Sequence, residues 1–295
     1  MEESIRKAAA LIEALPYIQK FRESTVVIKF GGSAMEDPEC TRSVLRDIVF
    51  MECAGMRPLI IHGGGKAITN RLASEGVQSQ FVDGLRYTDE TTIELVDEVL
   101  HDQVNANLIS IMHELNGKPY PLSGKDVLRA KKLLGKDSTG ARQKDLGYVG
   151  EVINIDTQQI HWVLERTEVP VITPVARDMD GTVYNVNADM VACRMAAELK
   201  ADKLVFLSDV PGILESTAED ASPIPTIKTT EVEPMIRREV IAGGMVPKIR
   251  SAADAVREGT GKVHLIDGRT PHSLLLEIFT DKGIGTEIVP PETTP

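Results

Sequence analysis

Two lysines of this chain stand beside glycine-rich turns, where an ammonium group and backbone N–H groups can meet the same anion. Lys29 follows the β-branched run of residues 26–28, which is typical of a strand buried on both faces. Gly31 and Gly32 come next, and glycines let the backbone turn sharply and approach a ligand closely. Because open α/β sheets bind ligands at the carboxyl ends of their strands, this stretch suits a phosphate group. The plainer alternative is a strand, a turn and a solvated lysine.

The same arrangement of strand, glycines and helix recurs at residues 59–66. His62 ends an apolar run, and Gly63, Gly64 and Gly65 follow it. Three consecutive glycines expose successive N–H groups, and the start of the next helix directs its positive dipole end toward an anion. A tight turn alone needs fewer glycines, so we interpret this segment as an anion site.

Lys248 lies in the first turn of a predicted helix, after the glycines at residues 243–244. The helix dipole disfavours a cation there, which indicates a strong anion nearby. Asn185, Asn187 and Asp189 alternate before another predicted helix, and one such side chain is enough to cap a helix. The three together therefore indicate a role beyond capping.

Arg86 lies in a polar connection at residues 84–88. Its guanidinium can fork onto a carboxylate, although a lone arginine in a loop is usually solvated. A further loop with proline and glycine follows a predicted strand at residues 208–213. The chain thus carries several loops at strand ends that can share one ligand.

The composition excludes several classes of protein. The 295 residues are enough for one large α/β domain or two lobes, and 42% hydrophobic residues is ordinary for a globular chain. A net charge of −11 argues against nucleic acid or an anionic membrane as partner, and no apolar run approaches the ~20 residues of a membrane span. The acidic start lacks a secretory core and the three cysteines lack metal spacing, so we expect a cytoplasmic protein.

Hydrophobic periodicity predicts alternating strands and helices along the chain. We expect helices at residues 1–22, 40–54, 89–115, 157–165, 190–199, 232–241, 248–258 and 272–279. We expect strands at residues 26–29, 59–61, 170–173, 182–184, 203–208, 263–266 and 286–289, with short strands or a hairpin around residues 123–126 and 147–150. Residues 216–228 are predicted to be an exposed connection.

The first predicted helix lies outside the pattern of strands. Its apolar residues fall on one face, and Pro16 would kink it. Such a helix packs either on its own domain or against the same helix of another subunit, and the residues leave both alternatives open.

Several common motifs are absent from the sequence. It has no P-loop, no Rossmann glycine fingerprint, no metalloprotease motif and no nucleophile elbow. Phosphoryl transfer needs little covalent chemistry from a protein, mainly positioning and charge neutralisation. Two lysines and several backbone amides around one cleft meet that need.

Six motifs together resemble the amino-acid kinase family, most of all its acetylglutamate-kinase branch. They are residues 29–33, 62–65, 84–88, 185–189, 208–213 and 243–248, and they occur in the family's order. The resemblance implies a three-layer αβα sandwich with a mostly parallel central sheet. It also implies a regulatory or oligomerising helix (1–22), an N-terminal lobe for the amino-acid substrate and dimerisation (23–176), and a C-terminal lobe for ATP and an effector (177–295).

The resemblance implies that the γ-carboxylate of N-acetyl-L-glutamate attacks ATP to give an acyl phosphate. Magnesium would then be held by the nucleotide phosphates rather than by protein ligands. Alternatives are an acyl-phosphate-forming kinase for an aminoadipate derivative or aspartate, and a catalytically inactive amino-acid sensor. The implied catalytic residues are Lys29, Asp189 and Lys248; the implied substrate-binding residues are Gly64, Gly65, Arg86, Asn185 and Asn187; and the implied nucleotide-binding residues are Gly31, Gly32, Ser208, Asp209, Gly212 and Lys248.

The resemblance extends to the arginine-sensitive type of this enzyme, which has such an N-terminal helix. It implies feedback inhibition by arginine and a homohexamer built as a trimer of dimers, with a dimer as the alternative. The implied effector residues are Tyr17, His264, Glu277 and Gly283. Glu277 is the expected partner of the effector's cationic group.

Overall fold

The structure is a computed structural model that describes residues 1–82, 84–136, 143–215, 222–280 and 283–291. Its centre is an eight-stranded sheet in the order β12-β14-β13-β11-β1-β2-β8-β5, parallel throughout except for the β13–β14 pair. The strands are β1 (Thr25–Phe30), β2 (Arg57–His62), β5 (Pro119–Leu122), β8 (Val169–Ile172), β11 (Lys203–Ser208), β12 (Thr226–Lys228), β13 (Lys262–Asp267) and β14 (Thr286–Val289). This arrangement confirms the predicted mostly parallel sheet.

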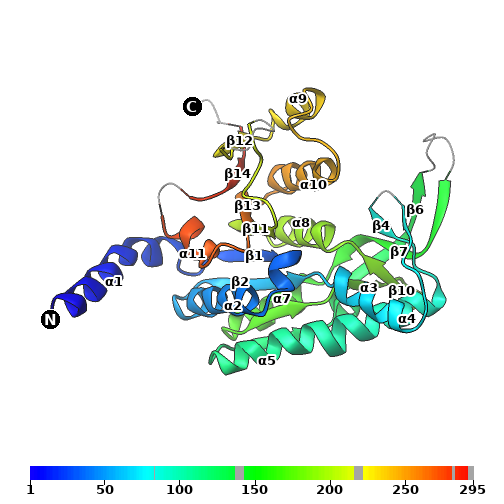
Figure 1. The fold of residues 1–295 in the computed structure, drawn as a ribbon, viewed down its shortest axis with the longest axis horizontal. Coiled ribbons are helices and arrows are strands. Elements are labelled where there is room, and N and C mark those ends of the chain that lie inside the picture. Colours follow the sequence, from blue (N-terminus) through cyan, green and yellow to red (C-terminus); the bar gives the residue numbers. More distant parts are fainter. Residues whose placement is uncertain (83, 137–142, 216–221, 281–282, 292–295) are drawn as a thin grey trace.

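Helices cover both faces of this sheet (Figure 1). The principal ones are α2 (Pro38–Cys53), α5 (Ala106–Glu114) and α11 (Ser273–Ile278) on one face, and α7 (Thr157–Glu165), α8 (Ala188–Glu198) and α10 (Met245–Arg257) on the other. The remaining helical elements are α1 (Glu2–Phe21), η1 (Ser33–Met35), α3 (Gly65–Ser74), α4 (Glu90–Glu98), η2 (Val99–Asn105), α6 (Gly124–Val127) and α9 (Val232–Arg237). The fold is therefore the predicted three-layer αβα sandwich.

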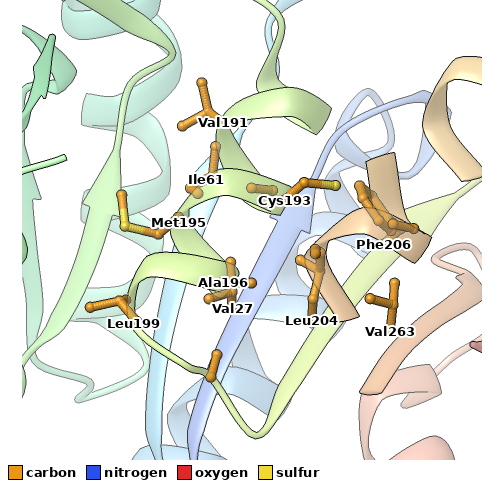
Figure 2. Close-up of a cluster of buried hydrophobic side chains, with 14 of the residues drawn as sticks. Val27, Ile61, Val191, Cys193, Met195, Ala196, Leu199, Leu204, Phe206 and Val263 are labelled. Carbon is orange, nitrogen blue, oxygen red and sulfur yellow. The ribbon is translucent and has the colours of Figure 1, made fainter. Parts of the chain in front are cut away.

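The two cores follow from the alternation of side chains along the strands. In β1, Val27 belongs to the core under α8 and α10, whereas Val26 and Ile28 belong to the core under α2 and α5. Figure 2 shows the first of these cores, where α8 lays Met195 and Ala196 across the central strands. Because parallel strands are buried on both faces, their sequences are continuously apolar, as the β-branched runs indicate.

A smaller four-stranded barrel lies beside the sheet. It contains β6 (Leu128–Lys136), β7 (Gln143–Ile155), β9 (Val175–Arg177) and β10 (Val183–Val186). The strand predicted around residues 147–150 is part of β7, but the strand predicted around residues 123–126 is wrong. Ser123 accepts a hydrogen bond from the backbone N–H of Lys125 and starts the helical turn α6 instead.

The helix predicted at residues 89–115 has an interruption. Helices α4 and α5 are joined by a π-helical segment, η2 (Val99–Asn105). Asn105 is buried within this segment, where its side chain has hydrogen-bond acceptors on two strands. A periodicity of 3.6 residues does not reveal such a segment, because most apolar positions remain on one face.

Two other predictions need adjustment. The connection at residues 216–228 ends in strand β12, because Ile227 is buried beside β14, whereas residues 216–221 lie outside the described residues. Helix α10 begins at Met245 rather than at Lys248, so that Lys248 is its fourth residue.

Helix α1 projects away from the sheet (Figure 1). It continues through Pro16, and Ile5, Leu11 and Ile12 are each more than half exposed. None of the helices in the described ranges is both long and apolar enough to span a bilayer.

Candidate active site

Lys29, Asp189 and Lys248 meet at the carboxyl ends of the central strands. Lys29 lies in β1, Asp189 in the first turn of α8, and Lys248 in the first turns of α10. The Lys29 Nζ lies 3.1 Å from Asp189 Oδ1, and the Lys248 Nζ lies 3.2 Å from Asp189 Oδ2. One carboxylate therefore pairs with two ammonium groups and fixes their positions relative to each other.

Burial and charge act in opposite directions on Asp189. Burial alone raises the pKa of its carboxyl group, but the two ammonium groups outweigh burial and leave that pKa below its ordinary value. The carboxylate is thus ionised at neutral pH and committed to two cations. It orders the lysines rather than acting as a general base.

The Gly31–Gly32 turn fits closely around charged groups. A Cβ on Gly31 would lie 2.7 Å from the Lys29 Nζ, and a Cβ on Gly32 would lie 2.6 Å from Asp209 Oδ1. Asp209 Oδ1 also accepts hydrogen bonds from the backbone N–H and the hydroxyl of Ser33, each at 2.8 Å. Asp209 therefore orders this turn.

The other two predicted nucleotide residues are also at this edge of the sheet. Ser208 ends β11, and its hydroxyl donates to the backbone carbonyl of Val210 at 3.1 Å. Gly212 has a φ of 144°, and a Cβ there would lie 2.6 Å from the hydroxyl of Thr286. The strand-end loop at residues 208–213 needs glycine for this close approach.

The triple-glycine loop (residues 63–65) lines a cavity of about 210 Å³ beside Lys29 and Asp189. Asn185 and Asn187 border the same cavity. The Asn187 side-chain oxygen caps α8 by accepting from two backbone N–H groups, and Asn185 Nδ2 donates to the hydroxyl of Thr88 at 3.3 Å. The structure thus brings together the substrate-binding residues predicted from three separate motifs.

Arg86 also borders this cavity, but most of its donors are engaged by the protein. Its guanidinium donates to the hydroxyl of Ser79, to the hydroxyl of Thr69 at 2.8 Å and to the carbonyl of Gly65 at 2.9 Å, and it stacks over the ring of Phe81. Burial lowers the pKa of this group, which nevertheless keeps its charge at neutral pH. In this structure Arg86 braces the glycine loop from the side.

A second cavity, of about 520 Å³, lies between the β6–β7 hairpin and the pair α8–α10. It shares Asn187 and Asp189 with the first cavity and is bordered by Lys248. Two adjoining cavities therefore meet at the lysine–aspartate cluster. This geometry suits two ligands that exchange a negatively charged group at the point where both lysines converge.

The four residues predicted for an effector gather elsewhere, near α11. Glu277 is buried, accepts from His264 Nδ1 at 2.6 Å and lies against Gly283, where a Cβ would be 2.9 Å from the carboxylate. The ring of Tyr17 packs edge-on against that of Phe279, with centroids 6.4 Å apart. The end of α1 and α11 are thus neighbours.

Glu277 is already satisfied by the protein. Its Oε2 accepts from the backbone N–H groups of Ile284 and Gly285, at 2.7 and 3.3 Å. Burial would raise the pKa of this carboxyl group, but the hydrogen bonds, with His264 first among them, leave it lowered. Burial dominates at His264 and lowers the pKa of its imidazole.

Sequence reasoning missed two buried residues that support the first cavity, His62 as a side chain and Asn105. From the sequence, His62 marks only the end of a strand. Asn105 is a single polar residue on the apolar face of a predicted helix, and one such residue does not indicate a functional role. No group of His, Cys, Asp or Glu side chains within the described ranges is arranged to hold a metal ion.

These features define an enzyme that transfers a phosphoryl group, and the comparisons agree: the chain belongs to the amino acid kinase family, whose profile matches residues 24–267. Among its relatives is the acetylglutamate kinase of Carboxydothermus hydrogenoformans, 44% identical over 98% of this chain and 100% of that protein. This confirms the resemblance inferred from the six motifs.

Solved structures with a similar fold include two of a related protein. N-acetylglutamate synthase from Neisseria gonorrhoeae, complexed with coenzyme A and N-acetyl-glutamate, has a TM-score of 0.84 and 26% identity, covering 97% of this chain and 64% of that one. Its complex with coenzyme A and L-arginine has a TM-score of 0.79 and 26% identity, covering 96% and 65% of the two chains. This chain thus spans slightly less than two thirds of that synthase.

Proposed function

We propose that this chain transfers the γ-phosphoryl group of ATP to the γ-carboxylate of N-acetyl-L-glutamate, forming an acyl phosphate for arginine biosynthesis. The observation that carries the proposal is the Lys29–Asp189–Lys248 cluster at the junction of two cavities. The name of the 44% identical relative supplies the substrate.

The reaction forms a bond between a γ-carboxylate oxygen and the γ-phosphorus, and it breaks the bond from that phosphorus to the bridging oxygen of ADP. A carboxylate is ionised at neutral pH, so the attack needs no general base. This requirement agrees with an Asp189 that is committed to two cations. Lys29 and Lys248 would neutralise charge on the transferred group and on the leaving ADP oxygen.

The acyl amino acid would occupy the smaller cavity. The N–H groups of Gly64 and Gly65 would bind its γ-carboxylate, and Asn185 and Asn187 would contact its amide and α-carboxylate ends. Arg86 contributes positive charge beside them, although its hydrogen bonds to the loop indicate that it acts largely by bracing Gly65. These roles rest on the residues that line the cavity.

ATP would lie across the Gly31–Gly32 turn and the start of α10. A Cβ on either glycine of this turn would fill the space beside Lys29 or Asp209. Ser208, Asp209 and Gly212 would border the nucleotide. Asp189 is paired with two lysines and Asp209 accepts hydrogen bonds from Ser33, so these two carboxylates are already engaged within the described residues. Magnesium would be held by the nucleotide phosphates, where it supplies charge neutralisation.

We further assign the N-terminal lobe (23–176) to the acyl amino acid and dimerisation, and the C-terminal lobe (177–295) to ATP and an effector. Lys29, the glycine loop and Arg86 come from the first range, whereas Asp189, Asp209 and Lys248 come from the second. We place the protein in the cytoplasm, in keeping with cysteines that are all unpaired.

One assay tests the proposed reaction. ADP release is measured with N-acetyl-L-glutamate, glutamate, aspartate and N-acetylaminoadipate in parallel, and hydroxylamine traps the acyl phosphate as a hydroxamate. We expect ADP and hydroxamate chiefly with N-acetyl-L-glutamate. Faster turnover of aspartate or of the aminoadipate derivative would assign one of these substrates instead. Ligand binding without ADP release would identify a catalytically inactive sensor.

We also propose that arginine inhibits the enzyme and that α1 assembles dimers into a hexamer. Support comes from the exposed apolar side chains of α1 and from the contact of Tyr17 with Phe279, next to the pair His264–Glu277. Arginine would bind near Gly283 and pair with Glu277. It can inhibit only if it binds the inactive arrangement more tightly than the active one.

Truncation tests this regulatory proposal. Removal of residues 1–20 should give active dimers that arginine no longer inhibits, measured by light scattering and by ADP release. A truncated protein that stays hexameric, or a full-length enzyme that millimolar arginine leaves unaffected, would contradict it.

A further inference from the structure

Each carbonyl of the triple-glycine loop accepts a hydrogen bond from another group of the protein. The donors are His62 Nδ1 to the carbonyl of Gly63 at 2.8 Å, the N–H of Ile68 to that of Gly64 at 2.9 Å, and Arg86 Nη2 to that of Gly65 at 2.9 Å. In a trans peptide the following N–H points opposite to the carbonyl. These bonds therefore turn the N–H groups of Gly64 and Gly65 away from the protein, toward the cavity that the loop lines.

The first of these peptides depends on the tautomer of His62. This side chain is fully buried, and burial lowers the pKa of its imidazole to about 4, so it is neutral at physiological pH. A carbonyl only accepts hydrogen bonds, so His62 must carry its proton on Nδ1 to hold Gly63. Its Nε2 must then be an acceptor.

Asn105 supplies the donor that Nε2 requires. Its Nδ2 lies 3.1 Å from His62 Nε2 and 2.9 Å from the carbonyl oxygen of Val171. Because the Val171 carbonyl can only accept, the amide must present its NH₂ group to this side. One amide proton binds the Val171 carbonyl and orients the amide group. The other binds His62 Nε2 and thereby fixes the His62 tautomer.

Two residues of the π-helical segment η2 support the triple-glycine loop. Asn105 holds His62, while Leu100, five residues earlier, packs so closely that a Cβ on Gly64 would lie 2.5 Å from its Cδ2. In an α-helix, residues five apart diverge by about 140° around the axis. The i to i+5 bonding of a π-helix places them nearly on one face.

We propose that Asn105, acting through His62, is a positioning residue that keeps the Gly63–Gly64 peptide oriented with its N–H toward the cavity. Without this fixed tautomer, His62 can present an Nδ1 lone pair to the Gly63 carbonyl, which favours a flipped peptide. The flipped peptide turns a carbonyl oxygen toward the anionic substrate and repels it. The inference rests on the proposed function, because it assigns the affinity of the acyl amino-acid site.

Other titratable groups surround His62. His101 of η2 is paired with Asp97, which in turn binds Lys125 of α6, and Lys29 of β1 lies near the loop. The pair with Asp97 raises the pKa of His101. None of these groups changes in the variants below, so a pH dependence that appears only in Asn105→Asp reports on position 105 and His62.

The test compares Asn105→Ser and Asn105→Asp with the matched control Asn107→Asp, an exposed position two residues further along the chain, in α5. Serine removes the amide donor without adding charge. Aspartate offers an acceptor to Nε2, so neutral His62 moves its proton there and leaves Nδ1 without one. At lower pH the protonated imidazole again donates from Nδ1. KM for both substrates and kcat are measured from pH 6 to 8.5.

For Asn105→Ser we expect KM for the acyl amino acid to rise roughly 3- to 10-fold at every pH. For Asn105→Asp we expect that KM to climb about tenfold or more from pH 6 to 8.5, with KM for ATP and kcat within about twofold of wild type. The wild type and Asn107→Asp should lack this slope. Equal damage to both KM values, or a flat profile in Asn105→Asp, would overturn the inference.

A second measurement does not depend on activity. Histidine ¹⁵N spectra of the wild type at neutral pH should contain the signal of a neutral, Nδ1-protonated ring that is lost in His62→Gln and is thereby assigned to His62. His264, whose Nδ1 donates to Glu277, should give a separate signal that remains in that variant. In Asn105→Ser the His62 signal should shift toward a tautomer mixture. An Nε2-protonated His62 in the wild type would refute the inference even if the kinase is active. An inactive wild type with the expected spectrum would instead contradict only the proposed function.

Discussion

Removal of the ammonium group of Lys248 should damage turnover far more than binding. Its Nζ lies 3.2 Å from Asp189 Oδ2, and the side chain is 17% exposed, so the charge acts in a partly desolvated site. At an effective dielectric constant of 20, two unit charges 4 Å apart interact by about 4 kcal/mol. The loss of a preorganised donor to a developing charge costs about 10²–10³ in kcat, or about 2.7–4 kcal/mol. The two estimates agree, and we expect Lys248→Ala to lower kcat by roughly 10²–10³-fold.

The assay is ADP release at saturating N-acetyl-L-glutamate and ATP, with each KM determined separately. The control is Lys262→Ala, which removes an ammonium group 2.8 Å from Glu287 at the surface of β13 and should leave kcat unchanged. Asp189 retains Lys29 in the Lys248 variant, so the melting temperature should fall only slightly. If the loss is confined to KM for ATP, Lys248 only binds the nucleotide and the reasoning is refuted.

Three further predictions concern single residues. Arg86→Lys should raise KM for the acyl amino acid and leave KM for ATP nearly unchanged, because a single ammonium nitrogen cannot occupy both positions from which Nη1 and Nη2 donate. Equal changes in both KM values would contradict this. Gly31→Ala should lower kcat with little change in melting temperature, because its Cβ would displace only the flexible ammonium group of Lys29. Gly124→Ala should instead unfold the protein, because its Cβ would lie 2.2 Å from two backbone carbonyl oxygens. His101→Gln should lower the free energy of unfolding more at pH 6 than at pH 8.5, as measured by urea unfolding. The hydrogen bond to Asp97 raises the pKa of His101 in the folded state, so the stabilisation from protonated His101 is fully present below about pH 6.5 and is lost as pH rises through the folded pKa.

The strand ends were predictable because each carries a strong local signal. Lys29 and the glycines after it follow a β-branched run, and the triple glycine follows another. Parallel strands with ligands at their carboxyl ends then place such loops side by side. Only the family resemblance placed Lys29, Asp189 and Lys248 in one catalytic set, since no local pattern links positions so far apart in the sequence.

The features that could not be predicted from the sequence depend on contacts between elements far apart in the chain. Asn105 looks like an interruption of an apolar face until its acceptors on β2 and β8 are known. Arg86 was expected to face a carboxylate, but its neighbours in space are the hydroxyls of Ser79 and Thr69. Glu277 was expected to pair with the cationic group of an effector, and its Oε2 accepts hydrogen bonds from two backbone N–H groups, which the sequence does not reveal. In each case the partner lies on another element.

The order of strands in the central sheet has a consequence for synthesis of the chain. β1 pairs on one side with β2 and on the other with β11, and the N–H of Thr25 binds the carboxylate of Asp202, 177 positions later. At 5–20 residues per second, the ribosome needs roughly 10 to 35 seconds between these two strands. During that interval the β11-facing edge of β1 has no native partner, which exposes an apolar strand edge of the nascent protein to wrong pairing. A product that stops before Lys248 would contain Lys29 and Asp189 but not the second cation.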